Sequence, residues 1–321
     1  MSNSSAIRKP REMTWLPLPE VPSFQARIVT PVLRMVVKRW PRGDYQALVR
    51  RARRLFGLPT WMSFLTSRDV TYEEVQGPDL CGEWVIPEAN YYEEKVLLYL
   101  HGGGYVSCTP RTHRPITATL ARMMYQRVFV LDYRLAPEAP FPAAVDDAVR
   151  AFAWLMEIGV KPENISIAGD SAGGGLVVAT LLRLKARQQL MPACAICLSP
   201  WVDLTGSASY GNAESCAMFR PEDVSAFAEL YLNGASPRRP EASPLFGDLQ
   251  GLPPLLIQCS TTELLFDEAV LLHEKAKKSG VESMLRAYPG LSHVWQMFIG
   301  LIPEANVALQ EIARFVYAQG K

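Results

Sequence analysis

Short runs of apolar residues recur along most of the chain and alternate with longer runs of helical periodicity. The short runs are almost continuously apolar, which is typical of strands that are buried on both faces of a sheet. They lie at Val96–Leu100, Val128–Leu131, Ile165–Ala168, Ala193–Leu198, Leu255–Cys259 and, more weakly, Ser283–Ala287. Between them, Ala144 to Met156 has apolar residues three and four positions apart, and Gly159 ends this run. The alternation predicts an α/β fold with a mostly parallel, doubly wound sheet and helices on both faces.

The first part of the chain has a different pattern. Pro31 marks the expected start of an amphipathic helix, and Asp44 is the expected cap of a second one. Apolar and polar residues then alternate around residues 70–72, and a second apolar stretch at 84–86 follows a Gly-Pro-Asp turn. This pattern predicts that a β-hairpin opens the main domain.

Residues 203–254 interrupt the strand–helix alternation. They hold no clear strand, are rich in Gly, Ser, Asn and Pro, and contain one helical run, Pro221 to Leu232. In a doubly wound sheet, ligands bind at the carboxyl ends of the strands, and a cap over these ends would shield the chemistry from water. We therefore predict an N-terminal helical cap segment over residues 1–65, a catalytic domain formed by 66–202 and 255–321, and a cap insertion over 203–254.

The composition permits a large core, because 49% of the 321 residues are hydrophobic. The net charge of +1 argues against a nucleic-acid-binding protein. The charge is unevenly distributed, since the first 60 residues hold twelve Lys or Arg and three Asp or Glu, which gives +9. We interpret this excess as the basic outer faces of amphipathic helices; contact with an anionic membrane or with a partner is the alternative.

The expected cellular location depends on two features that the sequence lacks. It has no apolar run of 18 residues, and residues 1–10 lack the apolar core of a signal peptide. The six cysteines are scattered and resemble small buried hydrophobic residues rather than a disulfide framework. Cys194 and Cys197 lie three apart in a predicted strand and would face opposite sides, which argues against a metal or redox pair. We expect a cytoplasmic protein without stable membrane insertion.

A serine between glycines directly follows the predicted strand Ile165–Ala168, in the stretch Gly-Asp-Ser-Ala-Gly at residues 169–173. A helix-like run begins near Gly174. A serine at such a strand-to-helix turn is typical of a nucleophile elbow, in which small neighbours tolerate the tight backbone and the hydroxyl points outward. Because this motif alone is common by chance, the hypothesis that Ser171 is a nucleophile depends on further features.

Three consecutive glycines follow His101, directly after the predicted strand Val96–Leu100. Glycines let backbone N–H groups approach a ligand closely, and two such donors aimed at one point form an oxyanion hole. We predict that the N–H groups of Gly102, Gly103 and Ala172 form it. A phosphate-binding loop is excluded because no Gly-Lys-Ser/Thr sequence follows the glycines.

A nucleophilic serine needs a general base, and the chain has four histidines. His101 belongs to the glycine loop, His113 precedes an apolar helix, and His273 lies within a helical run. His293 follows the last predicted strand, in a loop from which it can reach across the strand ends to the serine. We therefore predict His293 as the base.

Hydrolases with this arrangement have the chain order serine, acid, histidine, so the acid should lie between Ser171 and His293. Three candidates follow the predicted strand Leu255–Cys259, namely Glu263, Asp267 and Glu268. Glu263 has a loop position, whereas Asp267 is suited to cap the next helix. Glu263 is our prediction, and Asp267 is the alternative.

These motifs resemble those of the bacterial esterases similar to hormone-sensitive lipase, within the α/β-hydrolase superfamily. The resemblance covers about residues 70–320. It rests on the stretches 101–104 and 169–173, on Tyr-Arg-Leu-Ala-Pro-Glu at 133–138, and on the Pro-Pro pair at 253–254 before the strand that leads to the acid.

One departure from the family concerns the acid. The family usually has Asp-x-Leu-x-Asp-Glu where this chain has Glu-Leu-Leu-Phe-Asp-Glu at residues 263–268. Aligning the two motifs places Glu263 at the acid position. The resemblance implies an α/β-hydrolase fold with a helical cap and hydrolysis of carboxylic esters with short to medium acyl chains. It further implies no cofactor or metal, and a bracing role for residues 133–138 at the oxyanion loop.

The sequence says least about the walls of the substrate pocket and about the partners of the protein. Five residues beside the motifs are candidates for its walls, with ordinary core packing as the alternative for each: Tyr105, Trp201, Phe219, Trp295 and Met297. A serine amidase or peptidase, or a lipase, would use the same triad, and a non-catalytic binding protein is the alternative outside the enzymes. A small-molecule ester is the expected partner, and the oligomeric state stays open, a homodimer included.

Overall fold

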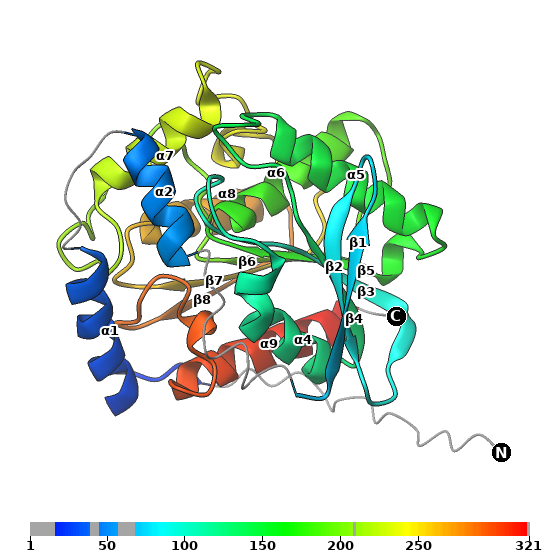
Figure 1. Ribbon diagram of the computed structural model, residues 1–321, viewed down its shortest axis with the longest axis horizontal. Coiled ribbons are helices and arrows are strands. Elements are labelled where there is room, and N and C mark those ends of the chain that lie inside the picture. Colours follow the sequence, from blue (N-terminus) through cyan, green and yellow to red (C-terminus); the bar gives the residue numbers. More distant parts are fainter. Residues whose placement is uncertain (1–16, 39–44, 57–67, 208–209, 320–321) are drawn as a thin grey trace.

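The computed structural model describes residues 17–38, 45–56, 68–207 and 210–319 (Figure 1). Eight strands form one sheet in the order β1-β2-β4-β3-β5-β6-β7-β8. From β4 to β8 the neighbouring strands are parallel, whereas β2 is antiparallel to both β1 and β4. The strands are β1 Val70–Gln76, β2 Cys81–Pro87, β3 Tyr92–Leu100, β4 Gln126–Leu131, β5 Ile165–Asp170, β6 Cys194–Leu198, β7 Leu255–Ser260 and β8 Ser283–Tyr288. The predicted α/β fold with an opening hairpin is confirmed.

Helices cover both faces of this sheet. In Figure 1, α4 (Arg114–Met124) and α9 (Pro303–Gln319) lie on one side, and α5 (Ala143–Glu157), α6 (Ala172–Ala186) and α8 (Phe266–Lys278) lie on the other. Each face packs its own apolar cluster, which explains why the strand residues are apolar without alternation. Cys194 belongs to one cluster and Cys197 to the other, so these cysteines face opposite sides as predicted.

The strand register brings two loops together at the carboxyl edge. Leu100, the last residue of β3, pairs with Gly169 of β5, and Asp170 pairs with Leu198, the last residue of β6. The loops that follow these strands therefore leave the sheet side by side. The glycine loop and the serine turn are neighbours for this reason.

The N-terminal helices differ in part from the prediction. Helix α1 spans Phe24–Val37 and contains Pro31 in its interior, so the prediction that it starts at Pro31 is wrong. The helix begins earlier because the Ser23 hydroxyl accepts the N–H of Ala26 at 3.2 Å and caps the first turn. Helix α2 spans Tyr45–Phe56, and its expected cap, Asp44, lies outside the described residues.

The insertion contains the expected helix, α7 (Pro221–Leu232), and no strand among its described residues. It contacts the first helix, because Arg34 donates to the carbonyl of Glu214 at 2.7 Å and Lys38 donates to that of Ala213 at 2.9 Å. Figure 1 shows α1, α2 and α7 along one side of the molecule. The division of the chain into a cap and a catalytic domain stays a prediction. In the part of the chain that the structure describes, no helix is long and apolar enough to cross a bilayer.

Candidate active site

Ser171 lies at the sharp turn between β5 and α6. Its φ of +54° and ψ of −121° belong to a region that few residues other than glycine adopt. Two backbone hydrogen bonds hold this turn: Ser171 N–H donates to Leu198 O at 2.8 Å, and Trp201 N–H donates to Ser171 O at 2.9 Å. The segment that follows β6 thus fixes the serine in its strained conformation.

His293 connects Ser171 to a buried carboxylate. Its Nε2 lies 2.9 Å from Ser171 Oγ, and its Nδ1 lies 2.8 Å from Glu263 Oε2. Both His293 and Glu263 are buried, and the second carboxylate oxygen of Glu263 accepts the N–H of Ser260 at 3.1 Å. A serine hydroxyl, an imidazole and a carboxylate in this order form a chain along which a proton can be taken from the serine.

The two candidate acids have different places in the structure. Glu263 lies in the loop after β7 and contacts the imidazole, whereas Asp267 lies in the first turn of α8. The next residue, Glu268, is buried and accepts the N–H groups of Val202 and Asp203 at 2.8 and 2.9 Å. Burial raises the pKa of Glu268 well above its ordinary value. The geometry therefore favours Glu263 as the partner of His293 and gives Glu268 a structural contact.

The glycine loop differs from the prediction at one residue. The N–H of Gly102 donates to Asp170 Oδ1 at 3.0 Å, so it is not available to a ligand and its assignment to the oxyanion hole is wrong. Gly103 and Gly104 line the cavity in front of Ser171, and their N–H groups have no acceptor among the described residues. Ala172 opens helix α6, where an N–H has no intrahelical acceptor. Gly104, which the sequence interpretation left out, lines the cavity, whereas Gly102 does not.

A buried polar network centred on Asp170 contacts the glycine loop through the N–H of Gly102. Asp170 accepts the hydroxyl of Tyr99 at 2.8 Å, and its Oδ2 lies 3.2 Å from His113 Nε2. Burial opposes the ionisation of Asp170, but the adjacent His113 and the hydrogen bond from Tyr99 outweigh it, so the pKa of this carboxyl is lowered. Burial, together with the nearby His113, lowers the pKa of His101 to about 3. His101 is therefore neutral at neutral pH, while Asp170 carries a charge.

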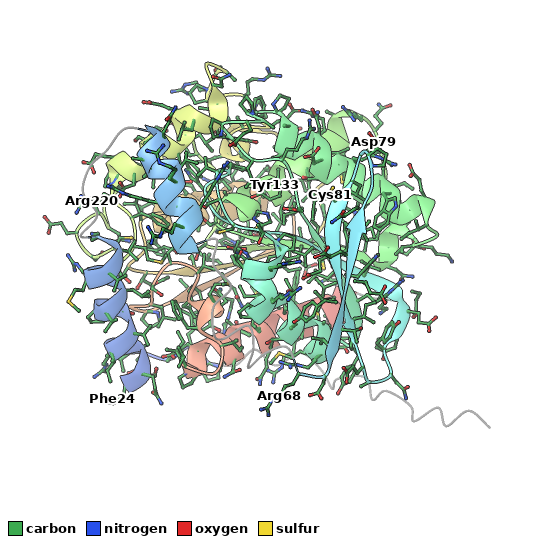
Figure 2. All side chains as sticks on the ribbon, in the orientation of Figure 1. Phe24, Arg68, Asp79, Cys81, Tyr133 and Arg220 are labelled. Carbon is green, nitrogen blue, oxygen red and sulfur yellow. The ribbon has the colours of Figure 1, made fainter. Side chains whose placement is uncertain are left out.

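Tyr133 braces the same loop from the centre of the molecule (Figure 2). Its hydroxyl donates to the carbonyl of His101 at 2.7 Å, and its ring stacks on the imidazole with centroids 4.3 Å apart. Arg53 of α2 adds hydrogen bonds to the carbonyls of Val106 and Ala136 at 2.9 and 3.2 Å. These contacts agree with the bracing role that the resemblance implied for residues 133–138.

A cavity of about 310 Å³ opens in front of Ser171, and its lining is mostly apolar. Of the five predicted wall residues, Trp201, Phe219 and Met297 line it. The prediction is wrong for Tyr105 and Trp295, which are buried in the two apolar clusters. Tyr105 stacks on Tyr231, and Trp295 packs against Tyr288. Both lie close in sequence to site residues but point into the core instead.

Sequence reasoning missed several cavity residues. They come from α1, from α7, from the turn at His113 and from the end of β5: Leu33, Val36, Val37, Val224, Phe227, His113 and Asp170. Asp170 carried a signal, because a carboxylate that directly follows an apolar strand is rarely buried without a specific partner. The helix residues carried none, since an apolar residue that faces a cavity looks the same in the sequence as one that faces a core. Among the described residues, no three His, Cys, Asp or Glu side chains are placed to hold a metal ion.

Comparisons with known proteins agree with this geometry. A family model described as alpha/beta hydrolase fold matches residues 97–297. An acetyl-hydrolase of Streptomyces hygroscopicus is 41% identical over 236 residues, which are 73% of this chain and 78% of that protein. An esterase of Acinetobacter venetianus is 38% identical over 224 residues, 69% of this chain and 74% of that protein. The crystal structure of an esterase from the bacterial hormone-sensitive lipase family has a TM-score of 0.85 at 39% identity, covering 93% of this chain and 99% of that chain.

Proposed function

Because the chain belongs to the alpha/beta hydrolases, among the esterases similar to hormone-sensitive lipase, and is a carboxylic ester hydrolase, we propose that it works through an acyl-enzyme on Ser171. The observation that supports this proposal is the hydrogen-bonded chain from Ser171 Oγ through His293 to Glu263. In this mechanism Ser171 is the nucleophile, His293 the general base and Glu263 the residue that orients the imidazole.

Acylation begins when Ser171 Oγ attacks the ester carbonyl carbon while His293 Nε2 takes the hydroxyl proton. Negative charge develops on the carbonyl oxygen and is stabilised by the N–H groups of Gly103, Gly104 and Ala172. The carboxylate of Glu263 stabilises the positive charge on the imidazole. The tetrahedral intermediate collapses when the bond to the alcohol oxygen breaks and His293 returns its proton to that oxygen.

Deacylation uses the same groups with water in the place of the serine. His293 takes a proton from water, the resulting hydroxide attacks the acyl carbon, and the second tetrahedral intermediate is bound by the same N–H groups. The carboxylic acid leaves when the bond to Ser171 Oγ breaks and His293 gives its proton back to the serine. One ester and one water thus yield one acid and one alcohol.

The cavity supports esters with short to medium acyl chains as substrates. Its volume of about 310 Å³ is at the lower end of the range of small-molecule sites, and its apolar walls match a hydrocarbon chain. Phe219 packs with its edge toward the His293 ring at a centroid distance of 5.2 Å, which keeps the reacting groups next to an apolar surface.

The test is the initial rate of hydrolysis of p-nitrophenyl esters from acetate to palmitate by the wild type and by Ser171→Ala. We expect a wild-type rate that is highest for short to medium chains, and a rate close to that of the uncatalysed reaction for the variant. An unchanged rate in Ser171→Ala would reject the serine as nucleophile. Turnover of matched p-nitroanilides but not of esters would instead identify an amidase.

A further inference from the structure

Helix α1 is apolar on two opposite sides. On its inner side, Ala26 and Val37 are buried, and Leu33 faces the active-site cavity. On its outer side lie four large apolar side chains that are 74%, 51%, 48% and 51% exposed, in this order: Phe24, Ile28, Val32 and Met35. Residues three, four and seven positions apart share one face of a helix, so these four form a continuous stripe, here called the outer stripe.

The outer stripe is unusual for this molecule. Ten large hydrophobic side chains are exposed among the described residues, and six of them lie within residues 21–36. The other four are scattered over separate parts of the surface: Tyr125, Ile158, Leu190 and Leu271. Single exposed apolar residues are normal on protein surfaces, whereas a contiguous group marks an interaction site. Figure 2 shows Phe24 at the outer end of α1, at the edge of the molecule.

Positive charge accompanies the outer stripe. Arg27 and Arg34 are exposed and lie seven residues apart, so they form a row along one edge of the stripe. Neither they nor Lys38 pairs with a carboxylate among the described residues, because their hydrogen bonds go to the main-chain carbonyls of Pro22, Glu214 and Ala213. Helices α1 and α2 contain no Asp or Glu. The charge along this edge is therefore not neutralised by any carboxylate in the part of the chain that the structure describes.

The outer stripe also borders the entrance of the cavity. Val36 is 51% exposed and at the same time lines the cavity, together with its neighbours Leu33 and Val37 on the inner side. Helix α1 is attached to the catalytic core at its first turn, where the N–H and the hydroxyl of Ser23 donate to the Glu304 carboxylate of α9 at 2.5 and 2.8 Å. A surface in contact with the stripe would thus meet the entrance as well.

We infer that the outer stripe binds the surface of an anionic lipid bilayer. A helix that has exposed apolar side chains and basic residues on its flank lies in the plane of such a surface, with its apolar face among the acyl chains. Phe24, Ile28, Val32 and Met35 enter the interface, while Arg27 and Arg34 contact the anionic headgroups. This adsorption is peripheral and needs no membrane-spanning segment. If the proposed esterase function holds, the entrance at Val36 then faces lipid, and esters dissolved in the bilayer are a substrate class.

The charges favour a bilayer over a second copy of the chain. A symmetric dimer through the outer stripe would bring Arg27 and Arg34 of two copies to one interface. Since α1 has no carboxylate to pair with them, these like charges would repel each other in the contact. An anionic surface instead complements both the apolar side chains and the charge.

The test is co-sedimentation of the full chain, as Ser171→Ala so that no lipid ester is hydrolysed, with vesicles. One set is pure phosphatidylcholine, and the other contains about one quarter phosphatidylglycerol. We expect binding to the anionic vesicles that is at least about tenfold stronger than to the neutral ones and that weakens with added salt. The double substitution Phe24→Ser with Ile28→Gln is expected to lower the partition coefficient about tenfold. Arg27→Gln with Arg34→Gln should remove the preference for anionic vesicles.

The control is Arg187→Gln with Leu190→Ser, which removes one exposed positive charge and one exposed apolar side chain near the end of α6. It should bind as the unsubstituted chain does. In the active background, Phe24→Ser with Ile28→Gln should leave the rate on soluble p-nitrophenyl butyrate unchanged, which shows that the fold is intact.

Three outcomes would overturn the inference: no binding to anionic vesicles, equal binding by the outer-stripe variant and the control, or a dimer that dissociates in the outer-stripe variant without any vesicle binding. Vesicle binding does not require turnover. Its failure is therefore distinct from a failure of the proposed esterase function, which the soluble ester reports.

Discussion

The imidazole of His293 lies between the hydroxyl of Ser171 and the carboxylate of Glu263. We expect Glu263→Gln to lower kcat by up to about 10⁴, because an amide stabilises the wrong imidazole tautomer and cannot offset its positive charge. Asp267→Asn, in the first turn of α8, should change kcat by less than about threefold. The measurement is kcat on p-nitrophenyl butyrate for both variants.

A shorter carboxylate provides the control for this prediction. Glu263→Asp keeps the charge but withdraws it from the ring, so kcat should fall between those of the wild type and Glu263→Gln. If Asp267→Asn lost as much activity as Glu263→Gln, the assignment of Glu263 would be contradicted.

At the residue scale, the sequence predicted the contacts of the triad, because few residues of the required types were available. Four histidines and three nearby acids left few combinations, and the predicted set, Ser171, His293 and Glu263, lies within hydrogen-bond distance. Among three equivalent glycines the prediction was wrong for Gly102 alone, because only the position of the Asp170 carboxylate shows that this N–H is already bonded. Tyr105 and Trp295 failed as wall residues for a similar reason, since nothing in the sequence distinguishes them from Trp201 and Phe219, which do line the cavity.

Helix α6 packs so closely against the carboxyl end of β3 that there is no space for a side chain at Gly173. A Cβ atom there would lie 2.0 Å from the carbonyl oxygen of Leu100 and 2.6 Å from that of His101. We expect Gly173→Ala to lower the free energy of unfolding by about 3 kcal/mol, because backbone rather than a flexible side chain must move. Urea denaturation monitored by circular dichroism measures this change.

Gly159→Ala is the matched control, because Gly159 also lies beside a helix but a Cβ there meets nothing within 4 Å. Its φ of +96° still disfavours alanine, so a loss of about 1 kcal/mol is expected. Equal losses in the two variants would contradict the close approach of α6 to β3 as the reason for the requirement at Gly173, because Gly173 has no positive φ that alanine would strain.

At the scale of elements, the short apolar runs located the strands well but did not determine which strands pair. The runs around Val128 and Leu255 became β4 and β7 with small changes at their ends. That β4 lies between β2 and β3 depends on contacts between distant residues, which periodicity does not contain. The start of α1 was missed because Pro31 is a typical first-turn residue, while the cap at Ser23 lies in a weakly patterned stretch.

The stability of the whole molecule should depend on the buried ring of His101. Its pKa is about 3 in the folded protein and near the ordinary 6.5 in the unfolded chain, so below pH 6.5 the unfolded state binds the extra proton. This group therefore lowers stability as the pH falls from 6.5 toward 3 and has no effect above 6.5. The slope approaches about 1.4 kcal/mol per pH unit. Urea denaturation at about pH 7.5 and about pH 5 measures the loss.

His101→Gln separates this group from the other groups that titrate in the same range. The variant is expected to be less stable than the wild type at neutral pH, because it loses the stacking with Tyr133. It should nevertheless lose less stability between the two pH values. An equal loss in the variant and the wild type would assign the acid sensitivity to other residues.

The hydrogen bonds between Ser23 and Glu304 join residues that are 281 positions apart. During translation at roughly 5 to 20 residues per second, Ser23 is synthesised about 14 to 56 seconds before its partner on α9. For that time the attachment of the first turn of α1 to α9 cannot form, and the outer apolar side chains of α1 stay uncovered on the nascent chain. His293 is also synthesised late, so a chain that ends before it exposes the apolar side chains of α1 and has no complete catalytic centre. A chain interrupted before residue 293 therefore lacks the general base and exposes apolar surface of the kind that chaperones bind.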